Sequence, residues 1–213
     1  MIPLKDATRS PVRFPLVTVG LIAINVLAFI WELGNDDATI VRFAVVPAEL
    51  MRGHGWTTPF TAMFLHAGFM HIIGNMLFLS AFAPVIEDTM GRGRFLVFYV
   101  LGGLAATAAQ VVISPGSTVP QLGASGAIAA VMGAFVVTFP GDRIKVLWLL
   151  GWIVEVAYVP AVLLIGIWLL TQLMNQVGAV VSADTGGVAY AAHVGGALFG
   201  MLTARLFERG GDR

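Results

Sequence analysis

The sequence contains no cysteine. Disulfide bonds, thiolate metal sites and a cysteine nucleophile are therefore excluded, and nothing indicates the redox state of the compartment. Charge is also scarce: only 11% of the residues are Asp, Glu, Lys or Arg, whereas an ordinary soluble domain has about 25%. The twelve basic and twelve acidic residues cancel, so no net positive field favours binding to nucleic acid.

Hydrophobic residues make up 58% of the chain and gather in long runs. A membrane-spanning helix needs about 20 apolar residues, with a range of roughly 17–25. Six runs approach or reach this length, and they cover residues 15–33, 60–86, 94–113, 124–140, 157–177 and 187–207. The sequence therefore predicts an all-α polytopic membrane protein with six transmembrane helices. We expect one domain over residues 1–213, with short tails at about 1–13 and 208–213.

The first run follows Lys5, Arg9 and Arg13, as the apolar region of a signal peptide would. It extends from Phe14 to Trp31, however, and is longer than the roughly 7–15 residues of a cleavable region. No clear small-x-small cleavage site follows it. We therefore expect this run to be retained as a transmembrane helix.

The basic residues are distributed unevenly between the segments that connect the runs. With the N-terminus in the cytoplasm, ten of the twelve fall in cytoplasmic segments, and only Arg42 and Arg52 fall in outer loops. The positive-inside rule therefore predicts that both termini are cytoplasmic, which requires an even number of spans. The stretch 141–155 is ambiguous, because it could also lengthen the fifth helix. Four charged residues favour a cytoplasmic loop with an interfacial piece, namely Asp142, Arg143, Lys145 and Glu155.

Polar side chains inside apolar spans are costly and by default mark a functional site. The second, fourth and sixth runs carry them, as His66, His71, Asn75, Ser125 and His193. His71 and Asn75 are four residues apart and share one helix face. All three runs cross from outside to inside in the predicted topology, and His71, Ser125 and His193 precede the inner ends by about 12–15 residues. At ~1.5 Å per residue, the three lie roughly 18–23 Å above the inner boundary.

The fourth and sixth runs carry small residues at helical spacing. These residues are Ser125, Ala129 and Gly133 in the fourth run, and Gly196 and Gly200 beside His193 in the sixth. Strips of this kind let two membrane helices approach closely. The sequence therefore predicts that these helices pack together and bring Ser125 towards His193.

A serine and a histidine at one depth suggest a nucleophile and a general base, because imidazole can take the proton of a weakly nucleophilic hydroxyl. Ser125 stands near a helix start, whose free N–H groups can stabilise an oxyanion together with donors from His71 and Asn75. No carboxylate lies in this layer, so we expect a Ser125–His193 dyad rather than a triad. For each residue alone, a structural role is the alternative. We expect His66 to make hydrogen bonds that hold the first loop.

Three sequence blocks resemble the signature blocks of rhomboid intramembrane serine proteases of bacterial type. They are HAGFMHIIGNMLFL, GASGAIAAVMGAF and YAAHVGGALFG, and EDTMGRGRFLVFYVLGG and the pattern around Pro160, Ala161, Trp168 and Gln172 are also similar to bacterial members. The resemblance implies Ser125 as nucleophile and His193 as general base. It implies an oxyanion hole from His71, Asn75 and the Ser125 N–H, with Gly123 and Gly126 shaping the turn.

The same resemblance implies a six-helix bundle with a water-filled cavity open to the outside. The implied reaction is hydrolysis of a peptide bond in or near a transmembrane helix, without metal or cofactor. The implied partners are transmembrane protein substrates and the lipid bilayer, and the implied location is a cell membrane, as in the bacterial inner membrane. Some members carry an aromatic residue one turn after the serine. Ala129 stands there in this chain, so another contact, such as packing near Tyr190, has to orient His193.

Three alternatives remain open. A non-catalytic relative that binds membrane helices usually lacks the serine or the histidine, and this chain has both. For a metal-dependent protease, His66 and His71 are five residues apart and rotated by about 140° on a helix, with no carboxylate in the layer. A transporter usually shows internal symmetry and paired broken helices, and only the fourth run looks unusual. The sequence predicts neither the substrate, nor the cleavage-site preference, nor the oligomeric state.

Overall fold

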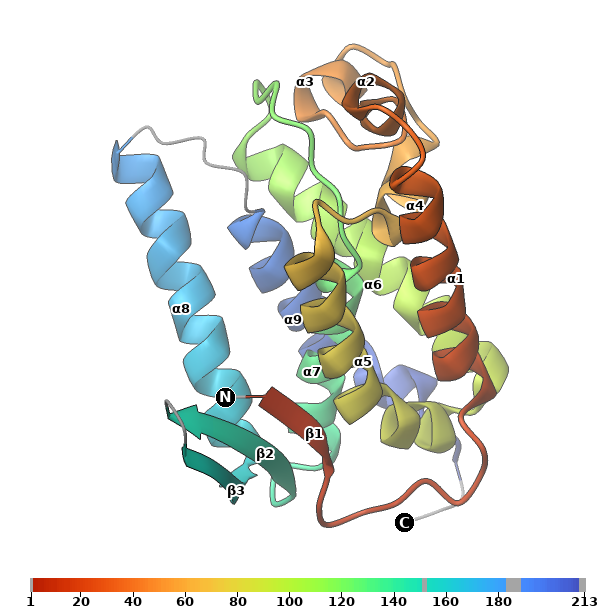
Figure 1. Ribbon diagram of the computed structural model, residues 1–213, viewed down its shortest axis with the longest axis vertical. Helices are drawn as coiled ribbons and strands as arrows, with labels where there is room; N and C mark the ends of the chain where they lie inside the picture. The colour runs from red at the N-terminus through yellow and green to blue at the C-terminus, as the bar shows by residue number, and fades with distance from the viewer. Residues whose placement is uncertain (1, 151–152, 183–188, 211–213) are drawn as a thin grey trace.

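The computed structural model describes all residues except 1, 151–152, 183–188 and 211–213. Six helices of 14 or more residues account for most of this described part (Figure 1): α1 (Leu16–Glu32), α5 (Phe69–Met90), α6 (Arg92–Ile113), α7 (Ser125–Thr138), α8 (Ala161–Ser182) and α9 (Tyr190–Phe207). Four short helices connect α1 to α5: α2 (Asp37–Val41), α3 (Pro47–Met51), α4 (Thr58–Thr61) and the 3-10 helix η1 (Ala62–Phe64).

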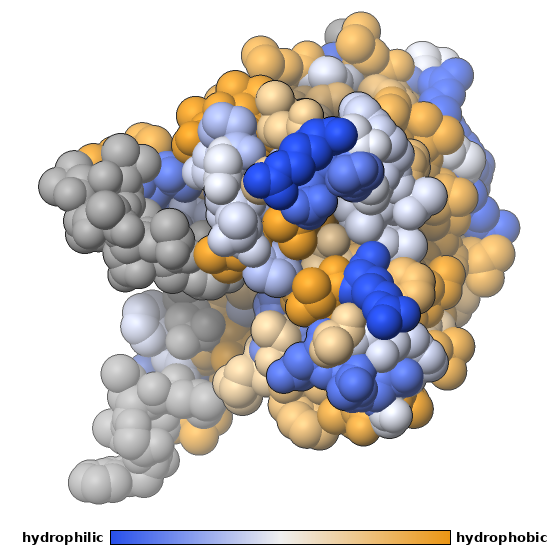
Figure 2. Space-filling view, turned by 90° about the horizontal axis from the view of Figure 1, so that it is seen from above, coloured by the Kyte–Doolittle hydropathy of each residue, from blue (hydrophilic) through white to orange (hydrophobic). Residues whose placement is uncertain are grey.

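Three of these helices are long and apolar enough to cross a membrane. They are Phe69–Met90, Arg92–Ile113 and the Ala161–Gly178 part of α8, while α1 and α7 are apolar but shorter. Large apolar side chains on several helices are exposed, among them Leu27, Leu101, Leu170 and Leu202. Viewed from the α2–α3 end, polar and charged residues gather within the face and apolar residues form most of its rim (Figure 2). This distribution suits a protein surrounded by lipid.

Helix α7 lies at the centre of the helices, with every residue from Gly126 to Phe135 buried. It packs most closely against α9, where a Cβ atom at Gly196 would overlap the carbonyl group of Gly126. A Cβ atom at Gly200 would likewise overlap the carbonyl group of Ala130. The predicted backbone-to-backbone approach of the fourth and sixth runs is therefore confirmed.

The prediction that residues 60–86 form one helix is wrong for the first part of this segment. Helix α4 and η1 occupy residues 58–64, and α5 begins only at Phe69. Gly68 separates them with a φ of 153°, a conformation that ends helical geometry and that residues with a Cβ rarely adopt. In the sixth expected run, residues 187–188 lie outside the described residues, and α9 begins at Tyr190.

The region predicted to be a cytoplasmic loop forms a three-stranded sheet with the N-terminal segment, so the all-α prediction is wrong at this end. Strands β2 (Arg143–Leu150) and β3 (Ile153–Pro160) pair antiparallel, and β1 (Ile2–Asp6) pairs with β2 on its other side. The fifth helix consequently begins at Ala161 rather than at residue 157. The stretch is rich in β-branched and aromatic residues, which favour a pleated, half-buried strand.

Polar contacts fasten the N-terminal segment at the sheet end. The Arg9 Nε donates to the Asp142 Oδ2 at 2.6 Å, and its guanidinium lies 4.5 Å from the centre of the Phe139 ring. The buried Glu87 of α5 accepts from the N–H groups of Val17 at 3.0 Å and Thr18 at 2.7 Å, and so satisfies the start of α1. Strand β1 and the end of α9 lie at this same end of the molecule (Figure 1).

Candidate functional site

A cavity of about 930 Å³ lies between α5, α7, α8 and α9, beneath the loop that precedes α7. The four residues predicted to react or to stabilise charge all line it: His71, Asn75, Ser125 and His193. They come from three helices that are distant in sequence, and the close packing of α7 with α9 brings the last two together. The polar residues that the sequence predicts to lie at one depth therefore line the same cavity.

Ser125 is the first residue of α7, and its hydroxyl contacts His193. The His193 Nε2 lies 2.8 Å from the Ser125 Oγ. Gly123, two residues earlier, has a φ of 134°, and a Cβ there would approach the His71 Nε2 to 2.9 Å. Backbone conformation and space thus both require glycine at this position.

Gln172 of α8 holds the other side of the His193 ring. The Gln172 Oε1 lies 2.8 Å from the His193 Nδ1. The Gln172 Nε2 donates to the Trp168 carbonyl at 3.4 Å, which assigns the oxygen to the histidine side. Because an amide oxygen only accepts, the His193 Nδ1 carries the proton, and the Nε2 lone pair faces Ser125.

Trp168 also packs on His193, with ring centroids 5.6 Å apart and planes inclined at 39°. The expectation that packing near Tyr190 orients His193 is therefore wrong, because Gln172 and Trp168 supply the contacts. Sequence reasoning included both residues in the resemblance but gave neither a role. The sequence does indicate a special role for Gln172, because it is a polar residue in an apolar run. It also follows Trp168 by four residues and therefore lies on the same helix face.

Three donors face the cavity beside Ser125. The His71 Nδ1 accepts from the Ala67 N–H at 3.2 Å, so the proton of the neutral ring resides on Nε2. The buried Asn75 Nδ2 has no hydrogen-bond partner among the described residues. The Ser125 N–H belongs to the first turn of α7, where no helical carbonyl precedes it and no side chain caps it.

Glu32, at the end of α1, fixes the loop that carries His66. Its two carboxylate oxygens accept from the His66 N–H at 3.1 and 3.0 Å. The ring of His66 lies 5.2 Å from the His71 ring, and its two nitrogens have no hydrogen-bond partner among the described residues. His66 thus makes the expected hydrogen bonds to the first loop region, and it makes them through its backbone N–H rather than through its ring. Glu32 escaped the sequence reasoning, although it is a lone carboxylate at the end of an apolar run.

Gln110 of α6 makes another contact that sequence reasoning missed. Its buried Oε1 accepts from the Ala192 N–H at 3.1 Å, which satisfies the first turn of α9 next to His193. A Cβ at Gly126 would lie 2.6 Å from the Ala106 Cβ, so this glycine lets α6 approach the start of α7. Within the described part of the chain, no group of three or more His, Asp or Glu side chains could hold a metal ion.

The arrangement can support acyl transfer. It combines a hydroxyl, an imidazole nitrogen with a free lone pair directed at that hydroxyl, and several N–H donors at one cavity wall. The cavity lies among apolar helices, where a low dielectric strengthens each of these interactions.

The chain is similar to known proteins over most of its length. Residues 53–209 match the rhomboid domain model. The chain is 28% identical over 193 residues to the mitochondrial presenilin-associated rhomboid-like protein of Bos taurus, covering 85% of this chain and 46% of that protein. It is 29% identical over 194 residues to the mitochondrial presenilin-associated rhomboid-like protein A of Danio rerio, covering 85% and 45%.

A bacterial relative matches over a shorter length. Rhomboid protease GluP of Bacillus subtilis (strain 168) is 32% identical over 133 residues, which cover 61% of this chain and 26% of that protein. The chain thus spans about half the length of the two mitochondrial relatives. Since the domain model matches well over half of its residues, the protein belongs to the rhomboid family.

Proposed function

We propose that this protein is an intramembrane serine endopeptidase that hydrolyses peptide bonds in or near transmembrane helices of membrane-protein substrates. A Ser125–His193 dyad carries the reaction. The 2.8 Å contact between the His193 Nε2 and the Ser125 Oγ, in the wall of a cavity among apolar helices, is the main support. A bacterial relative that is named a rhomboid protease supports the same reaction class.

The reaction proceeds in two acyl-transfer steps. The Ser125 Oγ attacks the carbonyl carbon of the scissile bond while the His193 Nε2 takes its proton. The oxyanion accepts hydrogen bonds from His71, Asn75 and the Ser125 N–H. His193 then gives the proton to the leaving amine, and the C–N bond breaks. Water, deprotonated by His193, attacks the resulting ester and restores Ser125.

The substrate is an apolar helix with a locally unwound segment. A peptide bond inside an intact helix is shielded and hydrogen-bonded, so helix-breaking residues near the bond favour cleavage. On the α5 side the cavity is lined by Phe69 and Met70, and on the α8 side by Trp168. Phe69 and Met70 are largely exposed, which suits contact with such a segment.

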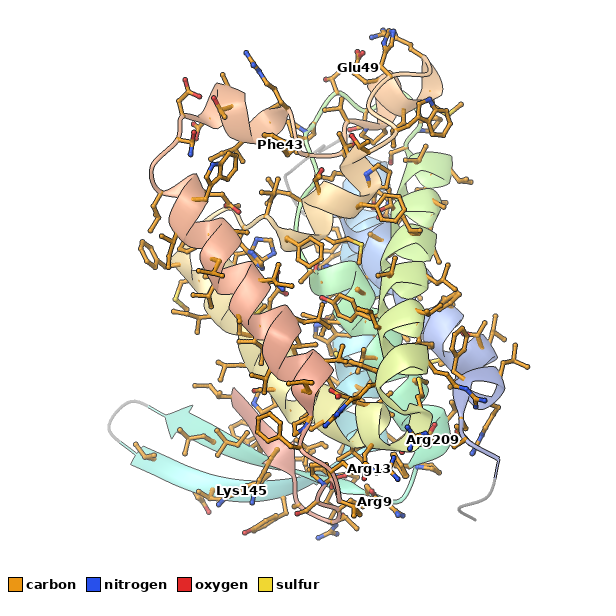
Figure 3. The ribbon with its side chains drawn as sticks, turned by 90° about the vertical axis from the view of Figure 1, so that its right-hand side faces the viewer. Arg9, Arg13, Phe43, Glu49, Lys145 and Arg209 are labelled. Atoms are coloured by element: carbon orange, nitrogen blue, oxygen red, sulfur yellow. The ribbon has the colours of Figure 1, made fainter. Side chains whose placement is uncertain are left out.

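All six long helices span the membrane in this proposal, with both termini in the cytoplasm. The sheet end carries Arg9, Arg13, Lys145 and Arg209, while Glu49 lies at the opposite end (Figure 3). The positive-inside rule assigns the basic end to the cytoplasm. Ser125, at the end of α7 away from the sheet, then faces the outer half of the bilayer.

A serine-directed fluorophosphonate probe tests the proposal. The protein in liposomes is expected to become labelled, and Ser125→Ala is expected to remain unlabelled, because only an activated hydroxyl reacts. Ser80→Ala is the matched control, since that hydroxyl is exposed and bonds its own helix at the Leu77 carbonyl. Equal labelling of Ser125→Ala would refute the nucleophile. An unlabelled but folded original protein would favour a non-catalytic protein that binds membrane helices.

Gln172→Leu is expected to lower the turnover number by roughly 10- to 100-fold with little change in KM, because the His193 tautomer and ring orientation lose their support. Gln172→Glu keeps an acceptor oxygen and is expected to retain more of the activity. Steady-state cleavage of a transmembrane-segment substrate measures both values, with Asn175→Leu, an exposed amide of the same helix, as the control. Unchanged turnover in Gln172→Leu would remove Gln172 from the site.

A further inference from the structure

A second cavity, of about 590 Å³, lies at the basic end of the molecule, far from Ser125. Three separate segments line it: the start of α1, the junction of α5 with α6, and the tail that follows α9. They contribute the arginines Arg13, Arg92 and Arg209. An adjoining cavity of about 480 Å³ adds Arg94. Figure 3 shows Arg13 and Arg209 at this end of the molecule.

Arg13 and Arg209 are the least engaged cations of this pocket, because Arg92 donates to the Phe14 carbonyl at 3.2 Å and Arg94 to the Glu208 carbonyl at 2.9 Å. None of the ion pairs found among the described residues includes Arg13 or Arg209. The two carboxylates in the wall already accept backbone N–H groups: Glu87 from α1, as described above, and Asp88 from Val12 at 2.8 Å. With Arg94, four positive charges face two negative charges, so the pocket favours an anion.

Backbone donors add to this preference at the start of α6. Gly91 precedes the helix with a φ of 79°, no side chain caps the helix, and no acidic residue stands in its first turn. The guanidinium of Arg209 lies against Gly91, where a Cβ would overlap it. A glycine at this position therefore lets Arg209 approach the free N–H groups, which bind oxyanions well.

One exposed apolar side chain lines the same pocket, and two more follow one helical turn after its lining residues. Phe14 is a lining residue and is 64% exposed. On α6, Leu96 and Val97 follow Arg92 and Gly93 by four residues, share their helix faces and are also exposed. An anionic phospholipid combines a phosphate with hydrocarbon chains in the same arrangement. A free phosphate ion would contact only the arginines and the backbone N–H groups, and not the apolar side chains.

We propose that this pocket binds the phosphate of an anionic phospholipid from the adjacent leaflet, with Arg13 and Arg209 as the principal contacts. The lipid would join the α1, α5–α6 and post-α9 segments at the basic end. Juxtamembrane arginines attract anionic headgroups electrostatically, and guanidinium groups match the geometry of phosphate oxygens. The site is independent of Ser125 and of proteolysis.

Thermal unfolding in neutral maltoside micelles tests the site. Dioctanoyl phosphatidylglycerol near saturation is expected to raise the Tm by about 5 °C, whereas phosphatidylcholine of the same chain length is expected to change it little. Arg13→Gln and Arg209→Gln are each expected to raise, at least tenfold, the phosphatidylglycerol concentration that is needed for this increase of the Tm. Both side chains are exposed, so folding should persist. Arg42→Gln, exposed at the opposite end, is the matched control.

Further measurements distinguish a lipid phosphate from a free phosphate ion. An equal rise of the Tm with inorganic phosphate at the same concentration would assign the pocket to a free anion and overturn the lipid proposal. Equal effects of the two lipids would also overturn it, as would a full response in the double variant Arg13→Gln/Arg209→Gln. A response to phosphatidylglycerol that is lost in the double variant and kept in Arg42→Gln would support it.

Discussion

Replacing Ser125 with alanine is expected to lower peptide-bond cleavage by roughly four to six orders of magnitude, and His193→Ala by a similar factor. In the proposed dyad the two side chains act as one unit, because the hydroxyl would react only when the imidazole 2.8 Å away takes its proton. The double variant Ser125→Ala/His193→Ala is therefore expected to be no slower than either single variant. Residual turnover would come from binding and the oxyanion donors alone.

Cleavage of a transmembrane-segment peptide in liposomes, followed by mass spectrometry, measures the three variants. His54→Ala is the control for loss of a histidine, because His54 is exposed in the connection between α1 and α5 and does not line the cavity. Unchanged cleavage by Ser125→Ala would end the nucleophile assignment. If the two single losses multiplied in the double variant, the residues would act independently, and the dyad would be the wrong description.

The second large effect concerns the contact between α7 and α9. Gly200→Ala is expected to destabilise the protein by about 1–3 kcal/mol, and Gly200→Val by more, because the added atoms collide with the Ala130 carbonyl in a close-packed interior. Backbone atoms cannot turn aside as the end of a flexible side chain can. The helices must separate, which also moves His193 away from Ser125.

Thermal unfolding and cleavage rate are measured on the same samples of these variants. Gly166→Ala in α8 is the matched control, since no atom lies within 4 Å of a Cβ placed there, and helix propensity predicts a small gain of about 1 kcal/mol or less. Cleavage by Gly200→Val is expected to fall more than the folded fraction does. A Gly200→Val protein as stable as Gly166→Ala would show that the two helices are not held at this separation.

Sequence reasoning identified Ser125, His193, His71 and Asn75 because each is a polar group at an energetically costly place. It also placed them in one layer, since helical rise converts sequence distance into depth. It failed for Gln172, because a polar residue in a span can face any of several neighbours, and only the packing of α8 on α9 selects His193. Glu32 escaped for the same reason, because its partner His66 is 34 residues away.

The sheet shows a second limit. The stretch 143–160 is apolar enough to be a buried helix or a pair of strands, and periodicity over a short apolar run does not separate the two. Strand β1 pairs with a partner about 140 residues away, with Ile2 opposite Leu147. No local pattern encodes such a pairing, because its stabilisation appears only when both segments meet at the same end of the molecule.

The sequence by itself determined the membrane class and singled out the residues of the candidate dyad, because scarce charge and costly polar groups are properties of composition and spacing. The tertiary structure decided which atoms meet. The glycines set the α7–α9 separation, Gln172 sets the His193 tautomer, and the arginines from three segments converge on one pocket. Each of these depends on distances between segments remote in the chain, and such distances follow from packing rather than from local order.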